Sequence, residues 1–178
     1  MRGTMLAGGV LLTLAGCNAV RPHPRVGEAV AGGAHAVAPL RSADGTQVGR
    51  ATATEVAGGI RFTVDARALP PGTHGAHVHS VGRCDAPDFA SAGPHWNPTG
   101  AKHGALNPMG PHQGDLPNLI IGADGRGTIG VIIPGASMAG LLDADGAALI
   151  VHAGADDLST DPSGNSGGRI ACGVFAAG

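Results

Sequence analysis

The feature that most restricts the fold is a two-residue alternation of apolar and polar side chains. Ile60, Phe62 and Val64 alternate with charged or hydroxyl-bearing residues, and the pattern continues to Ala68. Side chains two positions apart lie on the same face of a strand, so residues 60–68 are predicted to form a strand with one buried and one solvated face. Other apolar runs of strand length are NLIIG, TIGVII and AALIVH.

Short glycine turns separate these runs. The pairs typical of tight hairpins are Asp-Gly at 44–45, 124–125 and 145–146, and Gly-Gly at 58–59. No stretch keeps a helical period, although residues 137–142 can form one helical turn. The sequence therefore predicts an all-β fold, a Greek-key antiparallel β-sandwich or barrel, beginning near Ala34.

The segment from Val81 to Leu116 breaks the strand pattern. It is rich in glycine and proline and has no alternating run. A structureless segment of this length indicates either a wrong assignment or a functional loop. The histidines within it favour a functional loop.

His77 and His79 flank a single valine in the strand-like stretch GAHVHS. Residues at this spacing point to the same face of a strand. Two adjacent imidazoles are poor core filler but supply half of a metal site. Taken alone, the pair would more often be polar residues on a solvated strand face.

Further histidines favour the metal site. They lie in AGPHWNP, AKHG and GPHQGD of the long segment and at the end of ALIVH, and they are His95, His103, His112 and His152. Asp115 follows His112 by three residues. Such clustering, in a chain with 9 histidines in total, indicates a metal-binding constellation rather than chance.

Charge and aromatic content exclude other classes of function. The 178 residues include 11 basic and 13 acidic side chains, with no adjacent basic pair, which argues against nucleic acid as a partner. Aromatic residues are only 2% and tyrosine is absent, so base-stacking platforms cannot be built. The length suits one well-cored domain.

The N-terminal residues predict an export signal. Residues 1–16 contain Arg2 and an apolar stretch too short to anchor the chain across a bilayer, followed by small residues. The tetrapeptide LAGC, ending at Cys17, resembles the bacterial lipobox and predicts a lipoprotein signal peptide with lipidation of Cys17. An ordinary signal peptide cleaved nearby is the alternative.

The mature chain is then expected in two parts. Residues 17–33 predict a lipidated N-terminus and a linker, because they contain prolines and arginines but no apolar period. Residues 34–178 form the β domain. The protein is therefore expected to be exported to the periplasm or cell envelope, held on a bacterial membrane by its N-terminal lipid only.

The cysteine count agrees with this interpretation. The 3 cysteines of an exported chain leave one odd thiol, and lipidation of Cys17 accounts for it. Cys84 and Cys172 remain as a pair, and a disulfide between them is favoured in an oxidising compartment. Two buried free thiols are the alternative.

The motifs, in this order, resemble one known family. GAHVH, AGPHWNP, AKHG, HQGD, LIVHAGADD and GNSGGRIACGV are similar to the motifs of copper,zinc superoxide dismutases, from roughly Ala34 to the C-terminus. The stretch CDAPDFASAGPHWNPTG resembles bacterial members. The resemblance implies dismutation of superoxide to dioxygen and hydrogen peroxide by copper redox cycling, with a structural zinc.

The resemblance also implies a set of ligands. The implied copper ligands are His77, His79, His95 and His152. The implied zinc ligands are His95, His103, His112 and Asp115. His95 would thus bridge the two metals and, in the family mechanism, leave reduced copper and take a proton.

Two further residues and the disulfide follow from the same resemblance. Arg169 is expected over the copper as a catalytic residue, with a purely structural arginine as the alternative. Asp156 is expected to link the copper ligand His77 with the zinc ligand His103, without being a metal ligand itself. The alternative is that Asp156 is only a turn residue. Cys84 and Cys172 match the disulfide of the family.

The sequence departs from many relatives between Asp156 and Arg169. This segment is short and has no lysine, so electrostatic steering is expected to depend on little beyond Arg169. The alternative function is an exported copper/zinc-binding protein without turnover, and the complete ligand set with Arg169 favours the enzyme. The sequence leaves open whether the chain forms a homodimer and whether a copper-delivery partner loads it.

Overall fold

The computed structural model describes Met1 and residues 33–178. The signal peptide predicted for residues 1–16, the lipidation site Cys17 and the linker up to residue 32 lie outside the described residues. Among those that are described, no helix is both long and apolar enough to span a membrane.

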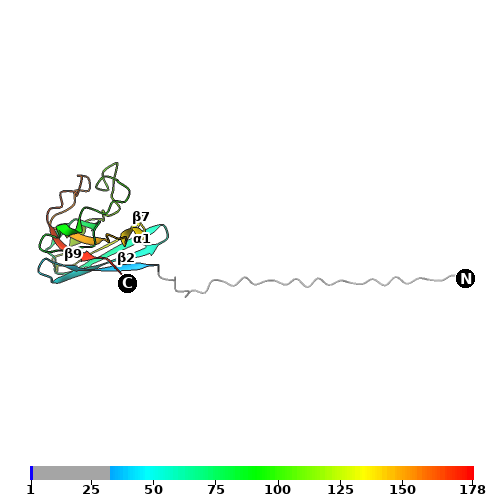
Figure 1. The fold of residues 1–178 in the computed structure, drawn as a ribbon, viewed down its shortest axis with the longest axis horizontal. Coiled ribbons are helices and arrows are strands. Elements are labelled where there is room, and N and C mark those ends of the chain that lie inside the picture. The colour runs from blue at the N-terminus through cyan, green and yellow to red at the C-terminus, as the bar shows by residue number, and fades with distance from the viewer. Residues whose placement is uncertain (2–32) are drawn as a thin grey trace. The chain divides into compact units, whose positions relative to one another are not determined.

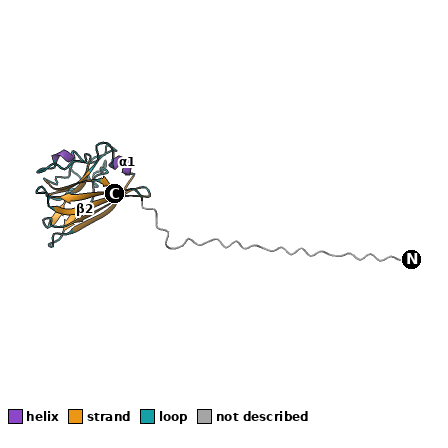
Figure 2. Cartoon of the chain, turned by 60° about the horizontal axis from the view of Figure 1, so that its bottom comes forward, coloured by secondary structure: helices purple, strands orange, loops and turns teal. Residues whose placement is uncertain are grey.

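The described domain is almost entirely β-structure, as the sequence predicts (Figure 2). Its elements are β1 (His35–Arg41), β2 (Gln47–Val56), β3 (Gly59–Ala66), β4 (Gly72–His74), β5 (Ala76–His79), the 3-10 helix η1 (Ala90–Ala92), β6 (Leu119–Ile121), β7 (Gly127–Pro134), α1 (Met138–Leu141), β8 (Ala148–His152), β9 (Arg169–Val174) and β10 (Ala176–Ala177).

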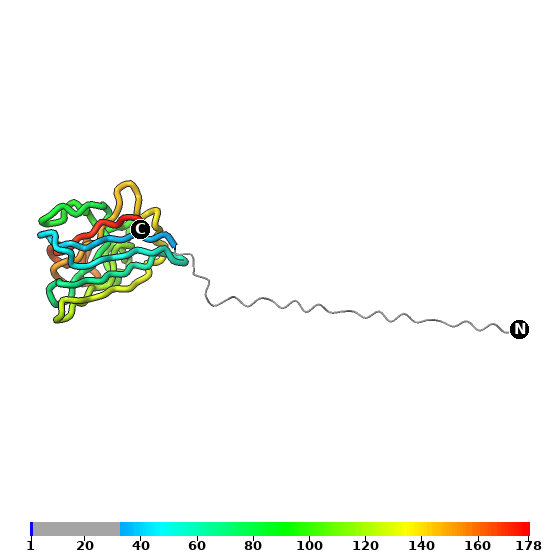
Figure 3. Tube along the Cα trace, turned by 90° about the horizontal axis from the view of Figure 1, so that it is seen from below, coloured from blue at the N-terminus to red at the C-terminus, as the bar shows by residue number. Residues whose placement is uncertain are grey.

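Most strands belong to one curled antiparallel sheet in the order β5-β8-β9-β1-β2-β3-β7, and β10 pairs with β1 (Figures 1 and 3). β3 lies beside β7 although three strands separate them in sequence, so the chain crosses over as in a Greek key. β4 and β6 form a separate two-stranded ladder. The sheet curls around a core of apolar side chains.

β3 shows why the alternating pattern predicts this core. Ile60 and Phe62 are buried, and Phe62 packs edge-on against Phe175 with ring centroids 6.0 Å apart. The strand ends at Ala66, two residues earlier than predicted, because Ala68 is exposed and has a φ of 55°. A left-handed backbone at an alanine cannot continue a strand.

The predicted hairpin turns are partly confirmed. The turns at 44–45 and 58–59 join strands that pair, β1 with β2 and β2 with β3. The prediction is wrong for 145–146, which lies between α1 and β8. There Asp143 Oδ1 accepts the N–H groups of Asp145 and Gly146, each at 3.0 Å, and the apolar residues before this turn form α1.

Two long loops lie over the curled sheet and against each other. One connects β5 to β6 and contains only η1, as expected for the segment 81–116, and the other connects β8 to β9 (Figure 1). Gly104 of the first loop has a φ of +94°, and a Cβ there would lie 2.1 Å from the carbonyl oxygen of Leu158 in the second. Only glycine permits this close approach.

Candidate metal centre

The strand β5 organises the histidines. His77 and His79 lie on it and are buried, and His152 ends the neighbouring strand β8. The β5–β6 loop returns along the free edge of β5, where isolated bridges pair His79 with His95 and His77 with Asp115. Residues far apart in sequence therefore meet at one end of this strand.

The first cluster consists of four imidazoles whose ligand atoms lie within 4.8 Å of one another: His77, His79, His95 and His152. Two of the rings are fixed by carbonyl groups, since His79 Nδ1 lies 2.8 Å from Gly93 O and His152 Nδ1 lies 3.1 Å from Gly167 O. A carbonyl oxygen only accepts, so both Nδ1 atoms carry the proton. Their Nε2 lone pairs are left for a cation.

The ring nitrogens that face the clusters provide a test of metal binding. Five buried ring nitrogens have no hydrogen-bond partner among the described residues: His77 Nδ1, His79 Nε2, His95 Nε2, His103 Nδ1 and His152 Nε2. Each unpartnered buried group costs about 1–3 kcal/mol. All of them belong to the clusters, so bound cations would relieve this cost. A set of four nitrogen donors suits copper.

The second cluster surrounds the carboxylate of Asp115. The Nδ1 atoms of His95 and His112 lie 2.8 and 3.1 Å from its Oδ1, and His103 Nδ1 lies 3.1 Å from its Oδ2 without a hydrogen bond to it. Three nitrogens and one carboxylate oxygen suit zinc. Burial alone would raise the pKa of Asp115, but hydrogen bonds from His95 and the Gly104 N–H hold it below its ordinary value.

Burial keeps three histidines of the first cluster, His79, His95 and His152, in the neutral form. It lowers the pKa of His79 to about 2 and the pKa values of His95 and His152 to about 4. The electrostatic repulsion between neighbouring imidazoles acts in the same direction. Metal ligation requires neutral imidazole, so these rings are ready to bind at neutral pH.

Asp156 connects the two clusters. Its Oδ2 lies 2.8 Å from His77 Nε2 and its Oδ1 lies 3.0 Å from His103 Nε2. Oδ1 also accepts the Leu158 N–H at 2.6 Å, so the residue shapes its turn as well. A Cβ at Gly164 would lie 1.8 Å from Asp156 Oδ1, so glycine is needed for the loop to close over this carboxylate.

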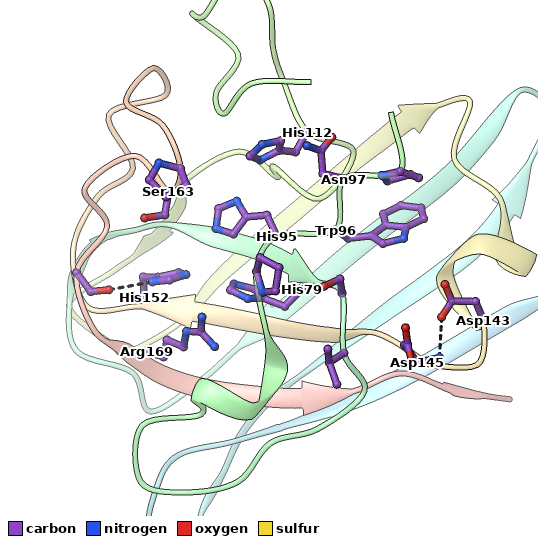
Figure 4. Close-up of a pocket in the computed structure, with 16 residues that line it drawn as sticks. His79, His95, Trp96, Asn97, His112, Asp143, Asp145, His152, Ser163 and Arg169 are labelled. Carbon is purple, nitrogen blue, oxygen red and sulfur yellow. Dashed lines mark hydrogen bonds between the residues drawn. The ribbon is translucent and has the colours of Figure 1, made fainter. Parts of the chain in front are cut away.

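Arg169 lies at the start of β9 and lines a cavity of about 730 Å³ with His79, His95 and His152 (Figure 4). Its Nη1 donates to Phe89 O at 2.6 Å and its Nη2 to Gly93 O at 2.8 Å. No carboxylate of the described residues lies within ion-pair distance of the guanidinium. Its positive charge is therefore available to an anion in the cavity.

Cys84 and Cys172 form the predicted disulfide, with their Cα atoms 5.7 Å apart, so the alternative of two free thiols is wrong. Cys84 belongs to the β5–β6 loop and Cys172 to β9. The bridge therefore fastens the loop that supplies Phe89 O and Gly93 O to the strand that carries Arg169.

Sequence reasoning missed two residues that support the site. His74 is buried, with Nδ1 2.8 Å from His152 O and Nε2 2.9 Å from Pro70 O. The Asn118 side chain donates to Asp156 O at 2.8 Å and accepts the Asp156 N–H at 2.9 Å. His74, close before the His-x-His pair, could have been noticed, whereas nothing in the sequence singles out Asn118.

Comparison with known proteins agrees with this geometry. The family model described as copper/zinc superoxide dismutase matches residues 47–175. A curated superoxide dismutase [Cu-Zn] from Caulobacter vibrioides is 42% identical over 147 residues, covering 79% of this chain and 84% of its own. The superoxide dismutase [Cu-Zn] of Escherichia coli K12 is 40% identical over 141 residues, covering 74% and 80%.

Solved structures give the same result. The crystal structure of a superoxide-dismutase-like protein from Bacillus subtilis has a TM-score of 0.75 and 42% identity, covering 82% of this chain and 100% of its own. The Cu/Zn superoxide dismutase from Brucella abortus has a TM-score of 0.66 and 33% identity, covering 80% and 99%. With the fold, the ligand clusters and these matches in agreement, the chain belongs to the copper/zinc superoxide dismutase family.

Proposed function

We propose that this protein dismutates superoxide, converting two superoxide anions and two protons to dioxygen and hydrogen peroxide. One observation carries the proposal: two complete ligand clusters share His95, and Arg169 lines the same cavity without a carboxylate partner among the described residues. A protein that only stores metal has no need of a cationic side chain at an open cavity beside its ligands. The alternative of metal binding without turnover is therefore not favoured.

The residues fit the two metals of the family. Copper would be held by the first cluster and zinc by the cluster around Asp115, with His95 belonging to both. Copper supplies one-electron exchange with superoxide, and zinc supplies a positive charge that cannot change valence. The donor sets, four nitrogens against three nitrogens and one oxygen, favour this distribution over the reverse.

The protein's own side chains would bind the substrate and handle protons. The Arg169 guanidinium attracts the superoxide anion and orients it in the cavity, because it is planar, always charged and offers several donors. His95 can hold a proton at Nε2 for the peroxide product, while its Nδ1 remains directed at Asp115. Asp156 keeps the rings of His77 and His103 in place, which is the usual task of a carboxylate behind metal ligands.

The direct test is a superoxide-consumption assay on the purified chain together with metal analysis. We expect one copper and one zinc per chain, and an activity that copper removal abolishes and copper, but not zinc, restores. Full metal loading without turnover would instead establish the metal-binding alternative.

We also propose that the chain is exported and anchored by a lipid on Cys17, supported by the lipobox-like LAGC. Cys17→Ser is expected to abolish lipid attachment and partitioning into detergent while leaving specific activity unchanged, because the linker separates Cys17 from the domain that begins near residue 34. Asn18→Ser, which keeps the cysteine, is the matched control. Detergent partitioning that persists in Cys17→Ser would contradict the anchor.

A further inference from the structure

Asp161, in the β8–β9 loop, contacts the other long loop at two points. Its Oδ1 accepts the main-chain N–H of His103 at 2.8 Å, and its Oδ2 lies 2.7 Å from Lys102 Nζ. His103 is also one of the three histidines around Asp115. The side chain of Asp161 therefore reaches from one loop to the backbone of a candidate zinc ligand in the other.

The position of Asp161 also matters for the cavity. The next two residues, Pro162 and Ser163, line the cavity that contains Arg169. The main-chain N–H of Leu106 also donates a hydrogen bond to the carbonyl oxygen of Leu158 at 2.8 Å, which joins the same two loops at another point. Any shift of Asp161 would thus move a cavity wall and the backbone of His103 together.

From these contacts we infer that Asp161 is a positioning residue for zinc, which sets the zinc affinity of the site by fixing the backbone of His103 and joins that ligand to the cavity wall at 162–163. The inference rests on the proposed function, since it requires zinc in the cluster around Asp115. It is separate from the contact of Asp156, which touches the His103 ring and not its backbone.

The two contacts of Asp161 are unequal. The ion pair with Lys102 is half-exposed, with the side chains 50% and 39% accessible, so water and salt screen it. The His103 N–H belongs to a residue whose side chain is fully buried. Most of the positioning effect is therefore assigned to the acceptor at Oδ1.

The test measures zinc affinity of the full-length, disulfide-bonded chain by competition with a chromophoric chelator, and records the visible spectrum of cobalt(II) bound in place of zinc. Asp161→Ala is expected to lower zinc affinity about 10- to 100-fold, as for other groups behind metal ligands, and to broaden the cobalt bands. Asp161→Asn keeps an oxygen acceptor for the His103 N–H and is expected to retain most of the affinity.

Two controls separate positioning from a general loosening of the loop. Lys102→Met removes only the ion pair and is expected to change zinc affinity by less than about fivefold. Asp157→Ala breaks hydrogen bonds to Ser159, Thr160 and Asn165 within the same loop but none to the His103 segment. It is expected to affect zinc less than Asp161→Ala does.

The outcomes discriminate clearly. Unchanged zinc affinity in Asp161→Ala, equal losses in Asp161→Ala and Asp157→Ala, or an Asp161→Asn variant as weak as Asp161→Ala would each overturn the inference. Those results would leave the proposed function standing. If the parent chain bound no zinc at all, that result would contradict the proposed function itself.

Discussion

Replacing His152 with alanine is expected to remove copper while leaving most of the zinc. His152 contributes Nε2 to the first cluster, where it has no hydrogen-bond partner among the described residues, and it is not a member of the cluster around Asp115. Losing a group behind a metal ligand already costs about 10- to 100-fold in affinity, so losing a ligand should cost on the order of 100-fold or more. The rate of superoxide consumption should fall by at least the same factor as the copper affinity.

Metal analysis of the purified variant checks this prediction, and His112→Ala is the matched control. His112 belongs only to the cluster around Asp115, so its replacement should lower zinc and spare copper. Equal loss of both metals in both variants would contradict two separate sites that share only His95. The same preparations should retain the disulfide between Cys84 and Cys172, which checks that the β5–β6 loop still lies against β9.

Local sequence patterns predicted the elements whose backbone conformation depends mainly on residues close together in the sequence. Alternation at Ile60 and Phe62 predicted β3, because the period of a strand is set by its own backbone. Glycine turns predicted the first two hairpins for the same reason. The pair His77 and His79 predicted one face of a strand, and the structure places both rings in one cluster.

What the patterns could not predict depends on long-range packing. The reach of Asn118 to the backbone of Asp156 and of Asp161 to His103 is set by how two loops fold against each other. The same is true of the carbonyl groups of Phe89 and Gly93, which fix Arg169. Every residue has a main-chain carbonyl, so the sequence does not indicate which carbonyls accept hydrogen bonds from Arg169. The orientation of that guanidinium is therefore known only from the structure.

The position of Arg169 combines structural and electrostatic roles that mutation can separate. Its two hydrogen bonds to loop carbonyls agree with the structural alternative, whereas its place in the cavity beside His79 and His152 agrees with anion binding. The whole chain carries a net charge of −2, which repels a superoxide anion at long range. A local positive charge is therefore needed near the metals.

Arg169→Ala is expected to keep both metals and the disulfide but to lower the superoxide rate by roughly tenfold or more, which corresponds to over ~1.4 kcal/mol of anion stabilisation. Arg169→Glu should be slower still, because it places a second anion in the cavity. Added salt screens attraction, so the rate of the parent should fall as salt rises, and this fall should weaken or reverse in both variants. Arg61→Ala is the control, since Arg61 is an exposed residue of β3 outside the cavity lining. If Arg169→Ala kept the parent's rate and salt dependence, the guanidinium would only brace the loop, and the attraction of superoxide would have to come from other charges.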